Sequence, residues 1–563
     1  MKGLSLLTLL SAFAVGPLLA PGYFWGAHDA RHSVYFLFEF NRAIGDGVWY
    51  PRWMPDFTFG YGYPFFNINS PLAYYLGEAF LKLGLDYVTA TKIVFGLAVV
   101  LSGWAMYGFV RGRINERAAL IAALVYVYAP YHLLDVYVRG ALAETVALAV
   151  LPLCLWAFAE TVERRRSAAV IGAGISYAAL TLAHSGLALL FSLMLAAYLL
   201  MLLVLTVHRA QPLNRLTGSS IVPLIGHVIH VGLAPLLGLL LGIGLSAIYL
   251  LPSLTELGSV RTDQYLTGTS ERFGYYDYHE HFSEFFQLFS PHWGYGLSQP
   301  GPHDDLSLQL GAAATLLALF SIVVVVRQVK WRASLTFFQV GTLALAFMML
   351  PQSTLLWDHL PLVAFAQFPW RLLALAALTM APLAGSVLAD FTAVEDKVRI
   401  LDMPTALLAT LVLFSSLPYT TAQIIEPVEG PVSCGGLMKF EHNAGELTGS
   451  TAWVRTIPTW GPLADVYLND EAPSTQVDYA SLPVGIVVDS RGHSSIHDEV
   501  WVHAESDGRI TFDRFMYPGW RAYLLDREHG QPIQALPVEP RGELGLLSVT
   551  VPRGEHFLLL RFE

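Results

Sequence analysis

Long apolar stretches recur along the chain from its first residues to about position 424, and short polar segments separate them. A helix needs about 20 mainly apolar residues to cross the roughly 30 Å hydrocarbon core of a membrane, and most stretches come close to that length. They do not alternate between apolar and polar residues, as the strands of a transmembrane barrel would. The pattern therefore predicts about eleven membrane-spanning helices, at residues 1–20, 87–109, 118–133, 141–160, 168–184, 186–207, 221–251, 307–326, 334–350, 371–389 and 403–424.

After residue 425 the apolar runs shorten, charged residues return and turn residues separate short alternating segments. This change predicts a helical membrane domain over residues 1–424 and a β-rich, sandwich-like domain over residues 425–563. At the end of the chain, residues 547–551 and 557–562 flank a turn and are expected to pair as a hairpin.

Another strand is expected at residues 509–515, just before the turn that contains Trp520. Trp520 and Tyr523 have two interpretations, because such aromatic side chains either stack on a sugar or pack in a core. Aromatic residues at strand spacing usually pack, so the pattern favours the core.

Lysine and arginine residues gather in every second loop between the apolar stretches. Because such residues stay on the cytoplasmic side of short loops, the pattern places the N-terminus in the cytoplasm and the C-terminus outside. The polar segments 21–86, 252–306 and 425–563 then share the outer face. Lys2 and the small residues near Ala20 also fit a cleaved signal peptide, an alternative that changes no later crossing.

The composition agrees with a membrane protein, since 54% of the residues are hydrophobic and only 14% are charged. The lipid bilayer is therefore the first expected partner. The net charge of −11 lies mainly in the outer segments and argues against nucleic acid as a partner. Cys154 falls in a predicted span and Cys434 in an outer segment, so the two are not expected to pair.

The first outer segment begins with a polar cluster of His28, Asp29, Arg31 and His32, directly after the first apolar stretch. A carboxylate flanked by histidines and an arginine at a membrane surface is a candidate for active-site chemistry. The aromatic residues that follow in this segment fit a belt that anchors the loop at headgroup depth. Such a belt alone would not need these four polar side chains together.

Further charged residues lie at the ends of predicted spans. Glu144 follows Arg139 near the start of one span, where a carboxylate is costly unless it is paired or used. The two could form an ion pair that closes the helix end, or Glu144 could support a metal or the acceptor; the sequence leaves both open. His184 has the same ambiguity at a predicted outer helix junction, where a helix-end role is the more ordinary interpretation.

The second outer segment, 252–306, contains histidines and carboxylates that could bind a divalent cation. The metal-ligand candidates are His279, His281, His303 and Asp304. The ordinary alternative is a polar lid over a cleft. A divalent metal cofactor is thus left open.

Three parts of the sequence together resemble a known family: the first outer segment, the segment Ala129–Glu144 and the segment Gln367–Arg371. They resemble bacterial multi-pass membrane proteins labelled "6-pyruvoyl-tetrahydropterin synthase-related", which are similar to GT-C glycosyltransferases. Nothing in the residues supports a pterin synthase, which is a soluble zinc enzyme. The resemblance implies a GT-C-like fold in the bacterial cytoplasmic (inner) membrane. It also implies transfer of a sugar from a polyprenyl-phosphate donor to a glycan, lipid or protein acceptor on the outer face.

The resemblance implies that a carboxylate in the first outer segment is central, which by position is Asp29. A carboxylate can take the proton of the acceptor, and guanidinium groups suit the departing phosphate. The candidate set comprises Asp29 and Glu144 for catalysis, Arg139, Arg371, Arg31 and Arg52 for the donor phosphate, and His28, His32 and His184 as supporting polar residues. The alternative is a non-enzymatic carrier or scaffold for a lipid-linked glycan or an exported partner. The clustering of charges at the outer ends of spans favours surface chemistry over passage through the bundle.

Overall fold

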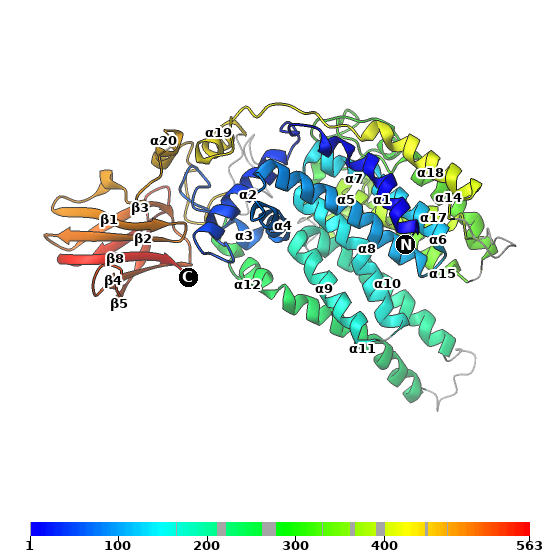
Figure 1. Cartoon of the computed structure of the whole chain (residues 1–563). Helices are drawn as coiled ribbons and strands as arrows, with labels where there is room; N and C mark the ends of the chain where they lie inside the picture. Colours follow the sequence, from blue (N-terminus) through cyan, green and yellow to red (C-terminus); the bar gives the residue numbers. More distant parts are fainter. Residues whose placement is uncertain are drawn as a thin grey trace.

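The apolar stretches fold into a bundle of helices, and the last part of the chain folds into two β-sheets at one end of the bundle (Figure 1). The computed structural model describes residues 2–164, 166–210, 221–261, 277–328, 330–360, 366–389, 400–444, 449–469 and 471–563. Part of the predicted outer segment 252–306, residues 262–276, lies outside the described residues. The predicted fold class, a mainly helical polytopic membrane part followed by a β-rich domain, is confirmed.

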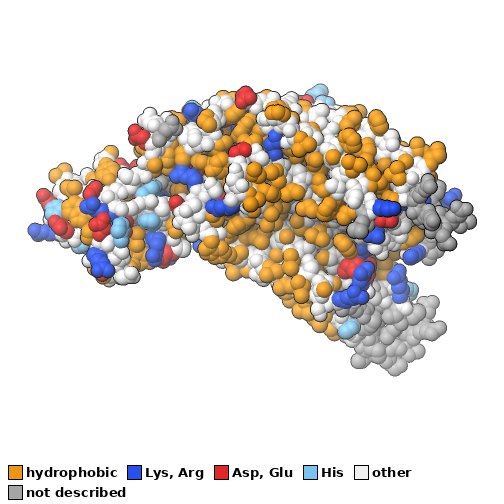
Figure 2. Space-filling view, viewed as in Figure 1, with side chains coloured by type: hydrophobic (Ala, Val, Ile, Leu, Met, Phe, Trp, Pro, Cys, Tyr) orange, Lys and Arg blue, Asp and Glu red, His pale blue; other side chains and the backbone are white. Residues whose placement is uncertain are grey.

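Five helices in the described part of the chain are long and apolar enough to cross a membrane by themselves. They are α1 with its extension η1 (Lys2–Leu19), α5 (Tyr87–Arg111), α8 (Leu142–Glu163), α10 (Ser185–Ala210) and α11 (Ile221–Leu245). Large apolar side chains on these helices and their neighbours face outward, and they form a broad hydrophobic surface over the bundle (Figure 2). Such a surface suits a hydrocarbon environment, as the composition predicts.

Other apolar helices are bent or shorter. The helix α6 (Glu116–Val127) continues with a 42° bend into α7 (Pro130–Leu134) and η2 (Asp135–Arg139), and α15 (Arg332–Met348) turns by 93° into η8 (Pro351–Ser353) and α16 (Thr354–His359). The shorter helices are α9 (Ser167–Ala183), α14 (Ala312–Arg327), α17 (Leu373–Ser386) and α18 (Met403–Ser416). The number of eleven spans stays a prediction.

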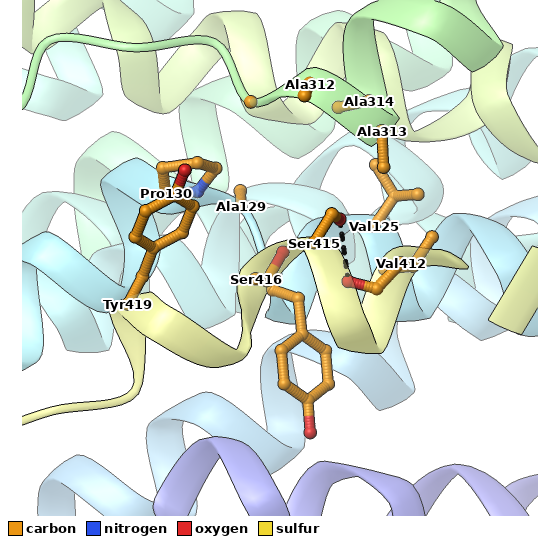
Figure 3. A pocket seen from close by; sticks show the side chains of 12 residues that line it. Val125, Ala129, Pro130, Ala312, Ala313, Ala314, Val412, Ser415, Ser416 and Tyr419 are labelled. Carbon is orange, nitrogen blue, oxygen red and sulfur yellow. Dashed lines mark hydrogen bonds between the residues drawn. The ribbon is translucent and has the colours of Figure 1, made fainter. Parts of the chain in front are cut away.

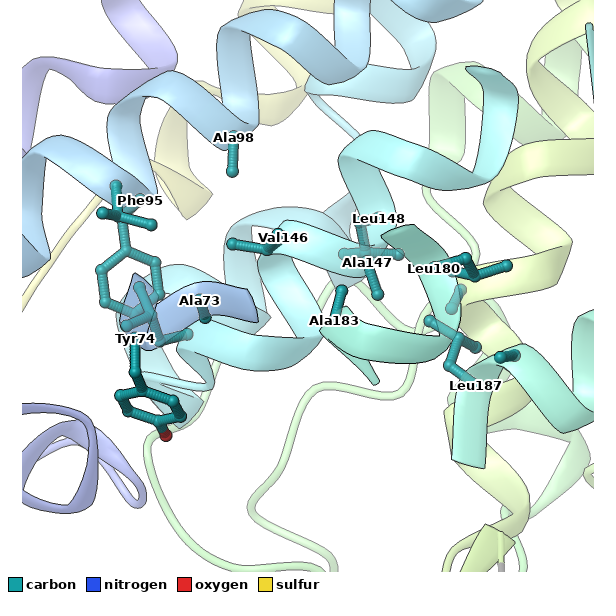
Figure 4. Close-up of a cluster of buried hydrophobic side chains, with 14 of the residues drawn as sticks. Ala73, Tyr74, Phe95, Ala98, Val146, Ala147, Leu148, Leu180, Ala183 and Leu187 are labelled. Atoms are coloured by element: carbon teal, nitrogen blue, oxygen red, sulfur yellow. The ribbon is translucent and has the colours of Figure 1, made fainter. Parts of the chain in front are cut away.

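Small residues let the helices of the bundle approach one another closely. Ala98 of α5 faces Val146 of α8, and Ala147 of α8 lies near Ala183 at the end of α9 (Figure 4). A Cβ atom on Gly385 in α17 would lie 2.3 Å from the Ala118 carbonyl oxygen of α6, so glycine is needed at that crossing.

The first outer segment forms three helices between the bundle and the sheets: α2 (Ala30–Gly45), α3 (Phe65–Ile68) and α4 (Leu72–Leu81) (Figure 1). Their aromatic side chains pack on one another, with ring centroids 4.1 Å apart for Phe36 and Phe65. Trp53 is fully buried, whereas Trp49 is 72% exposed. The aromatic residues of this segment therefore serve mainly as core, with Trp49 at the surface.

The last 78 residues of the chain contain the strands, in two facing sheets. One sheet has the order β1-β2-β8-β4-β5 and the other has the order β3-β7-β6. The strands are β1 (Ile486–Ser494), β2 (His497–Ala504), β3 (Gly508–Phe515), β4 (Trp520–Leu525), β5 (Pro532–Leu536), β6 (Val538–Arg541), β7 (Leu546–Val551) and β8 (Gly554–Phe562). The strand expected at 509–515 is confirmed as β3, and the predicted β-rich character of this part of the chain is confirmed. The sandwich-like arrangement stays a prediction.

The predicted hairpin of residues 547–551 and 557–562 is wrong. The strand β7 pairs with β3 and β6, whereas β8 pairs with β2 and β4 in the other sheet. Residues 547–551 alternate apolar and polar, whereas 557–560 are all apolar and only Leu558, Leu560 and Phe562 of β8 are buried. Each strand lays one face on the shared core, so the pattern does not distinguish partners in one sheet from neighbours in two. Trp520 is 1% exposed and lies in this core, as expected.

The connecting segments contain short elements. These are α12 (Ala247–Thr255), η5 (Leu257–Ser259), η6 (Tyr278–Glu280), η7 (Phe285–Leu288), η10 (Pro369–Leu372), η11 (Leu417–Tyr419), α19 (Cys434–Ala444), α20 (Pro462–Leu468) and η12 (Tyr479–Ser481). The helices α19 and α20 lie after residue 425, next to the sheets and the first outer segment (Figure 1). The domain boundary at 424/425 stays a prediction.

Candidate active site

A break in one membrane helix gathers the charged residues of the site. Pro130 has no N–H to continue the ladder of α6, and it occupies the first turn of α7, where that loss costs little. The following turn, η2, is a π-helix that ends at Gly140, whose φ of 65° lies in the left-handed region. The chain then starts α8 at Leu142. The sequence predicted one continuous span to residue 133; the structure instead ends α6 at Val127 and places the polar residues of 131–144 around the break.

Glu144 and Arg139 form the centre of a buried cluster. The Arg139 Nη1 lies 2.7 Å from the Glu144 Oε2, and the same nitrogen donates to Asp135, which is fully buried. The Tyr131 hydroxyl donates to the Glu144 Oε1 at 2.6 Å. The ion pair expected from the sequence is therefore present, within a larger network.

Arg371 approaches Glu144 from the other side. Its Nε lies 3.2 Å from the Glu144 Oε2, and its Nη1 donates to the Ala366 carbonyl oxygen at 2.8 Å and to the Gln367 Oε1 at 3.0 Å. The neighbouring Trp370 ring lies 5.0 Å from the Arg139 guanidinium carbon, a cation–π distance. Glu144, in the first turn of α8, thus contacts Arg139 at the end of η2 and Arg371 in η10.

Asp29 lies at the solvent-exposed edge of this cluster. Its carboxylate is 47% exposed and stands 3.9 Å from the Arg139 Nη2. It precedes α2 in the N-cap position, yet its side chain forms no capping hydrogen bond. The neighbouring His28 ring contacts the Tyr295 carbonyl oxygen at 3.1 Å, and burial lowers the pKa of His28, so this ring is neutral near pH 7.

His184 completes the group at the junction of α9 and α10. The Leu187 N–H donates to the His184 Nδ1 at 3.1 Å, so the proton of the neutral ring is on Nε2. That Nε2 lies 3.8 Å from the Glu144 Oε2. His184 is therefore both a helix-end residue and a neighbour of the central carboxylate.

The other candidates have partners elsewhere. The Arg31 Nε lies 3.4 Å from the Glu429 carboxylate, and the His32 ring packs against Phe36 and Phe440. The Arg52 guanidinium contacts Glu256 at 2.6 Å and Asn67 at 2.8 Å, close to the β domain. The structure thus brings Asp29, Glu144, Arg139, Arg371 and His184 together, and it gives Arg31 and Arg52 other ion-pair partners.

The metal-ligand candidates are spread over different contacts. His279 contacts Asp277 at 2.6 Å and Asp358 at 3.1 Å, whereas the His281 Nδ1 faces the Ser298 hydroxyl at 2.9 Å. His303 and Asp304 line a surface pocket with His292 and Asp305, and burial raises the pKa of Asp304 to about 6. Among the described residues, no group of three or more His, Cys, Asp and Glu side chains is arranged to hold a metal ion.

A small pocket lies behind the helix break, lined by residues of α6, α7, α14 and α18 (Figure 3). Its lining includes Ala129 and Pro130 at the break, together with Ser415, Ser416 and Tyr419. It has no charged side chain, so it is no candidate for the chemistry.

Several site residues escaped the sequence analysis: Asp135, Tyr131, Trp370 and Gln367. All lie inside two of the three segments that carried the family resemblance, Ala129–Glu144 and Gln367–Arg371. The spacing of four between Asp135 and Arg139, in an otherwise apolar run, is a signal that could have marked Asp135 as a partner.

A family model described as "6-pyruvoyl-tetrahydropterin synthase related domain; membrane protein" matches residues 66–419. No match was found among curated protein sequences. The fold is similar to that of the Archaeoglobus fulgidus oligosaccharyltransferase in the apo form, with 13% identity and a TM-score of 0.45 over 76% of this chain and 56% of that chain. It is also similar to ArnT from Cupriavidus metallidurans bound to undecaprenyl phosphate, with 14% identity and a TM-score of 0.42 over 69% of this chain and 60% of that chain.

A third similar structure is the arabinofuranosyltransferase AftD from Mycobacteria, with 13% identity and a TM-score of 0.45 over 74% of this chain and 26% of that chain. The chain therefore spans little more than half the length of the oligosaccharyltransferase that it matches. These values describe a partial similarity of backbone fold.

Proposed function

This chain belongs to the family of 6-pyruvoyl-tetrahydropterin synthase related membrane proteins, as its sequence predicted, and we propose that it is a membrane glycosyltransferase. In this proposal it transfers a sugar from a polyprenyl-phosphate donor to an acceptor hydroxyl on the outer face of a bacterial cytoplasmic membrane. The acceptor is a glycan, a lipid or a protein.

The observation that carries the proposal is the position of Arg139 between Asp29 and the buried pair of Glu144 and Arg371. Its Nη1 contacts the carboxylates of Asp135 and Glu144, while its Nη2 points toward the half-exposed Asp29. Neither Arg139 Nη2 nor Arg371 Nη2 donates a hydrogen bond to a described residue. These two nitrogens are therefore available for the oxygens of a phosphate, beside a carboxylate that solvent can reach.

The proposed step is a single displacement at the anomeric carbon of the donor. The acceptor oxygen forms a bond to that carbon while Asp29 takes the acceptor proton. The bond between the anomeric carbon and the phosphate oxygen breaks, and polyprenyl phosphate leaves with the bonding electrons. Arg139 and Arg371 stabilise the negative charge on the leaving phosphate, and Glu144 holds both guanidiniums in place.

The test is sugar transfer by the purified full-length chain in nanodiscs, with a panel of undecaprenyl-phosphate sugars. We expect Asp29→Asn to lower the rate at least a hundredfold and to leave binding of undecaprenyl phosphate unchanged. The matched control is Asp489→Asn, which removes an exposed carboxylate on β1 and should keep the wild-type rate. A wild-type protein that binds the donors but neither transfers nor hydrolyses any sugar would favour the carrier or scaffold alternative.

A further inference from the structure

The backbone of the Asp29 loop is joined to the end of the broken helix. The His28 N–H donates to the Val138 carbonyl oxygen at 3.1 Å, and the Asp29 N–H donates to the Arg139 carbonyl oxygen at 2.5 Å. Two consecutive residues of the loop therefore pair with two consecutive residues at the end of η2. Asp29 and Arg139 are linked through their main chains, although their side chains stand 3.9 Å apart.

Gly140 makes this close approach possible. A Cβ atom on Gly140 would lie 2.7 Å from the backbone nitrogen and 2.8 Å from the Cα of Ala30, the residue after Asp29. The contact is with backbone, which cannot turn aside as a flexible side chain would. The φ of Gly140, 65°, also lies in the region that favours glycine.

Ser33 closes the junction from the first turn of α2. Its hydroxyl donates to the Gly140 carbonyl oxygen at 2.8 Å, and its N–H donates to the Asp29 carbonyl oxygen at 2.9 Å. The side chain is buried, with 3% of the residue exposed. It is thus the one described side chain that bonds α2 to Gly140.

We propose that Gly140 and Ser33 are positioning residues that set the place of the Asp29 carboxylate relative to the Arg139 guanidinium. This inference rests on the proposed function. The Asp29 side chain forms no capping hydrogen bond and stands 3.9 Å from the Arg139 Nη2, so the hydrogen-bonded backbone of its loop sets the place of its carboxylate. A displacement of about 1 Å at a reacting group can cost about a hundredfold in rate.

The experiment compares Gly140→Ala and Ser33→Ala with wild type in nanodiscs, using three measurements: sugar transfer, undecaprenyl phosphate binding and hydrogen exchange of the peptide that contains His28 and Asp29. Gly140→Ala should lower the transfer rate at least about a hundredfold. Ser33→Ala, which loses one buried hydrogen bond, should lower it up to about tenfold. Both should leave undecaprenyl phosphate binding within about twofold of wild type and speed exchange in that peptide.

The control for backbone strain is Gly84→Ala, because Gly84 has a φ of 88° but open space around its Cβ position. It should leave both the rate and the exchange of the 28–29 peptide unchanged. The proposal is overturned if Ser33→Ala and Gly140→Ala transfer sugar at the wild-type rate, or if exchange in that peptide does not change. A wild-type protein without transfer activity would instead end the proposed function, and hydrogen exchange would still decide whether the two residues hold Asp29.

Discussion

Glu144 is the residue on which the charged cluster depends. It is buried, accepts from Tyr131 and lies within 3.2 Å of two guanidinium groups. Removing one partner of a buried ion pair leaves an uncompensated charge in a medium of low dielectric, which costs more than the pair itself contributes. Glu144 therefore has a structural role in addition to the function proposed for its neighbours.

We expect Glu144→Gln to lower the free energy of unfolding by about 3 kcal/mol or more, since Arg371 would lose its carboxylate. The control is Glu163→Gln, because Glu163 is 40% exposed and pairs with Arg113 at 3.1 Å; its loss should cost less than about 1 kcal/mol. Thermal unfolding of both variants in the same detergent measures the difference. Equal melting temperatures for the two variants would contradict a buried role for Glu144.

Asp513 in β3 gives the β domain a pH-dependent stability. Burial, with a smaller contribution from nearby Asp478, raises the pKa of Asp513 from 3.8 to about 7. The folded state therefore binds this proton more tightly than the unfolded state, so its stabilising effect is complete below pH 4 and is lost as the pH rises to about 7. Asp513→Asn should remove this part of the pH dependence. Unfolding curves of the full chain at pH 5 and pH 8 test it: the stability that the variant gains over wild type should be clearly larger at pH 8 than at pH 5.

At the scale of elements, the first outer segment joins the bundle to the β domain. Trp53 is fully buried there, and its ring centroid lies 5.4 Å from that of Trp520 and 5.7 Å from that of Phe562. Arg52 adds a polar contact, because its partner Glu256 also accepts from the Tyr517 hydroxyl at 2.7 Å. The β domain is therefore fastened to this segment by apolar packing and by a shared carboxylate.

Truncation of this contact should loosen the β domain. Trp53→Ala should cost about 3–5 kcal/mol, the range for a large buried aromatic side chain. Trp49→Ala, which truncates a residue that is 72% exposed, should change stability by less than about 0.5 kcal/mol. Limited proteolysis measures the effect through the rate at which the β domain is released. Similar release from both variants would show that the junction does not depend on Trp53.

The sequence could predict some of these elements and contacts but not others. The helices of the bundle follow from the length of apolar stretches, and the charges at 139 and 144 could be predicted as partners because an apolar surrounding demands one. The partners of β7 and β8 could not be predicted, since an apolar strand pattern shows that one face is buried but not which strand lies beside it. The partner of Arg31, Glu429, is far away in the sequence, and only the folded chain brings it near.

At the scale of the whole molecule, the charges suggest an orientation in the membrane. The β sheets lie at one end of the molecule, and the helices α2, α3 and α4 of the first outer segment lie between them and the bundle (Figure 1). Asp29 directly precedes α2. Basic residues such as Arg113, Arg117 and Arg164 lie in the loops that alternate with the segment of Asp29 along the sequence. Since basic loops are kept in the cytoplasm, the proposed site and the β domain should face outside.

Two serine positions can test this orientation. In a Cys434→Ser background, Ser506→Cys places a thiol in the exposed turn between β2 and β3, and Ser167→Cys places one at the exposed start of α9, beside Arg164. A membrane-impermeant maleimide should label Ser506→Cys in intact spheroplasts and should label Ser167→Cys only after permeabilisation. The second native thiol, Cys154, is fully buried and should stay unlabelled in both. The reverse pattern would place Asp29 in the cytoplasm, where a donor presented on the outer face could not reach it, and would contradict the proposed transfer on that face.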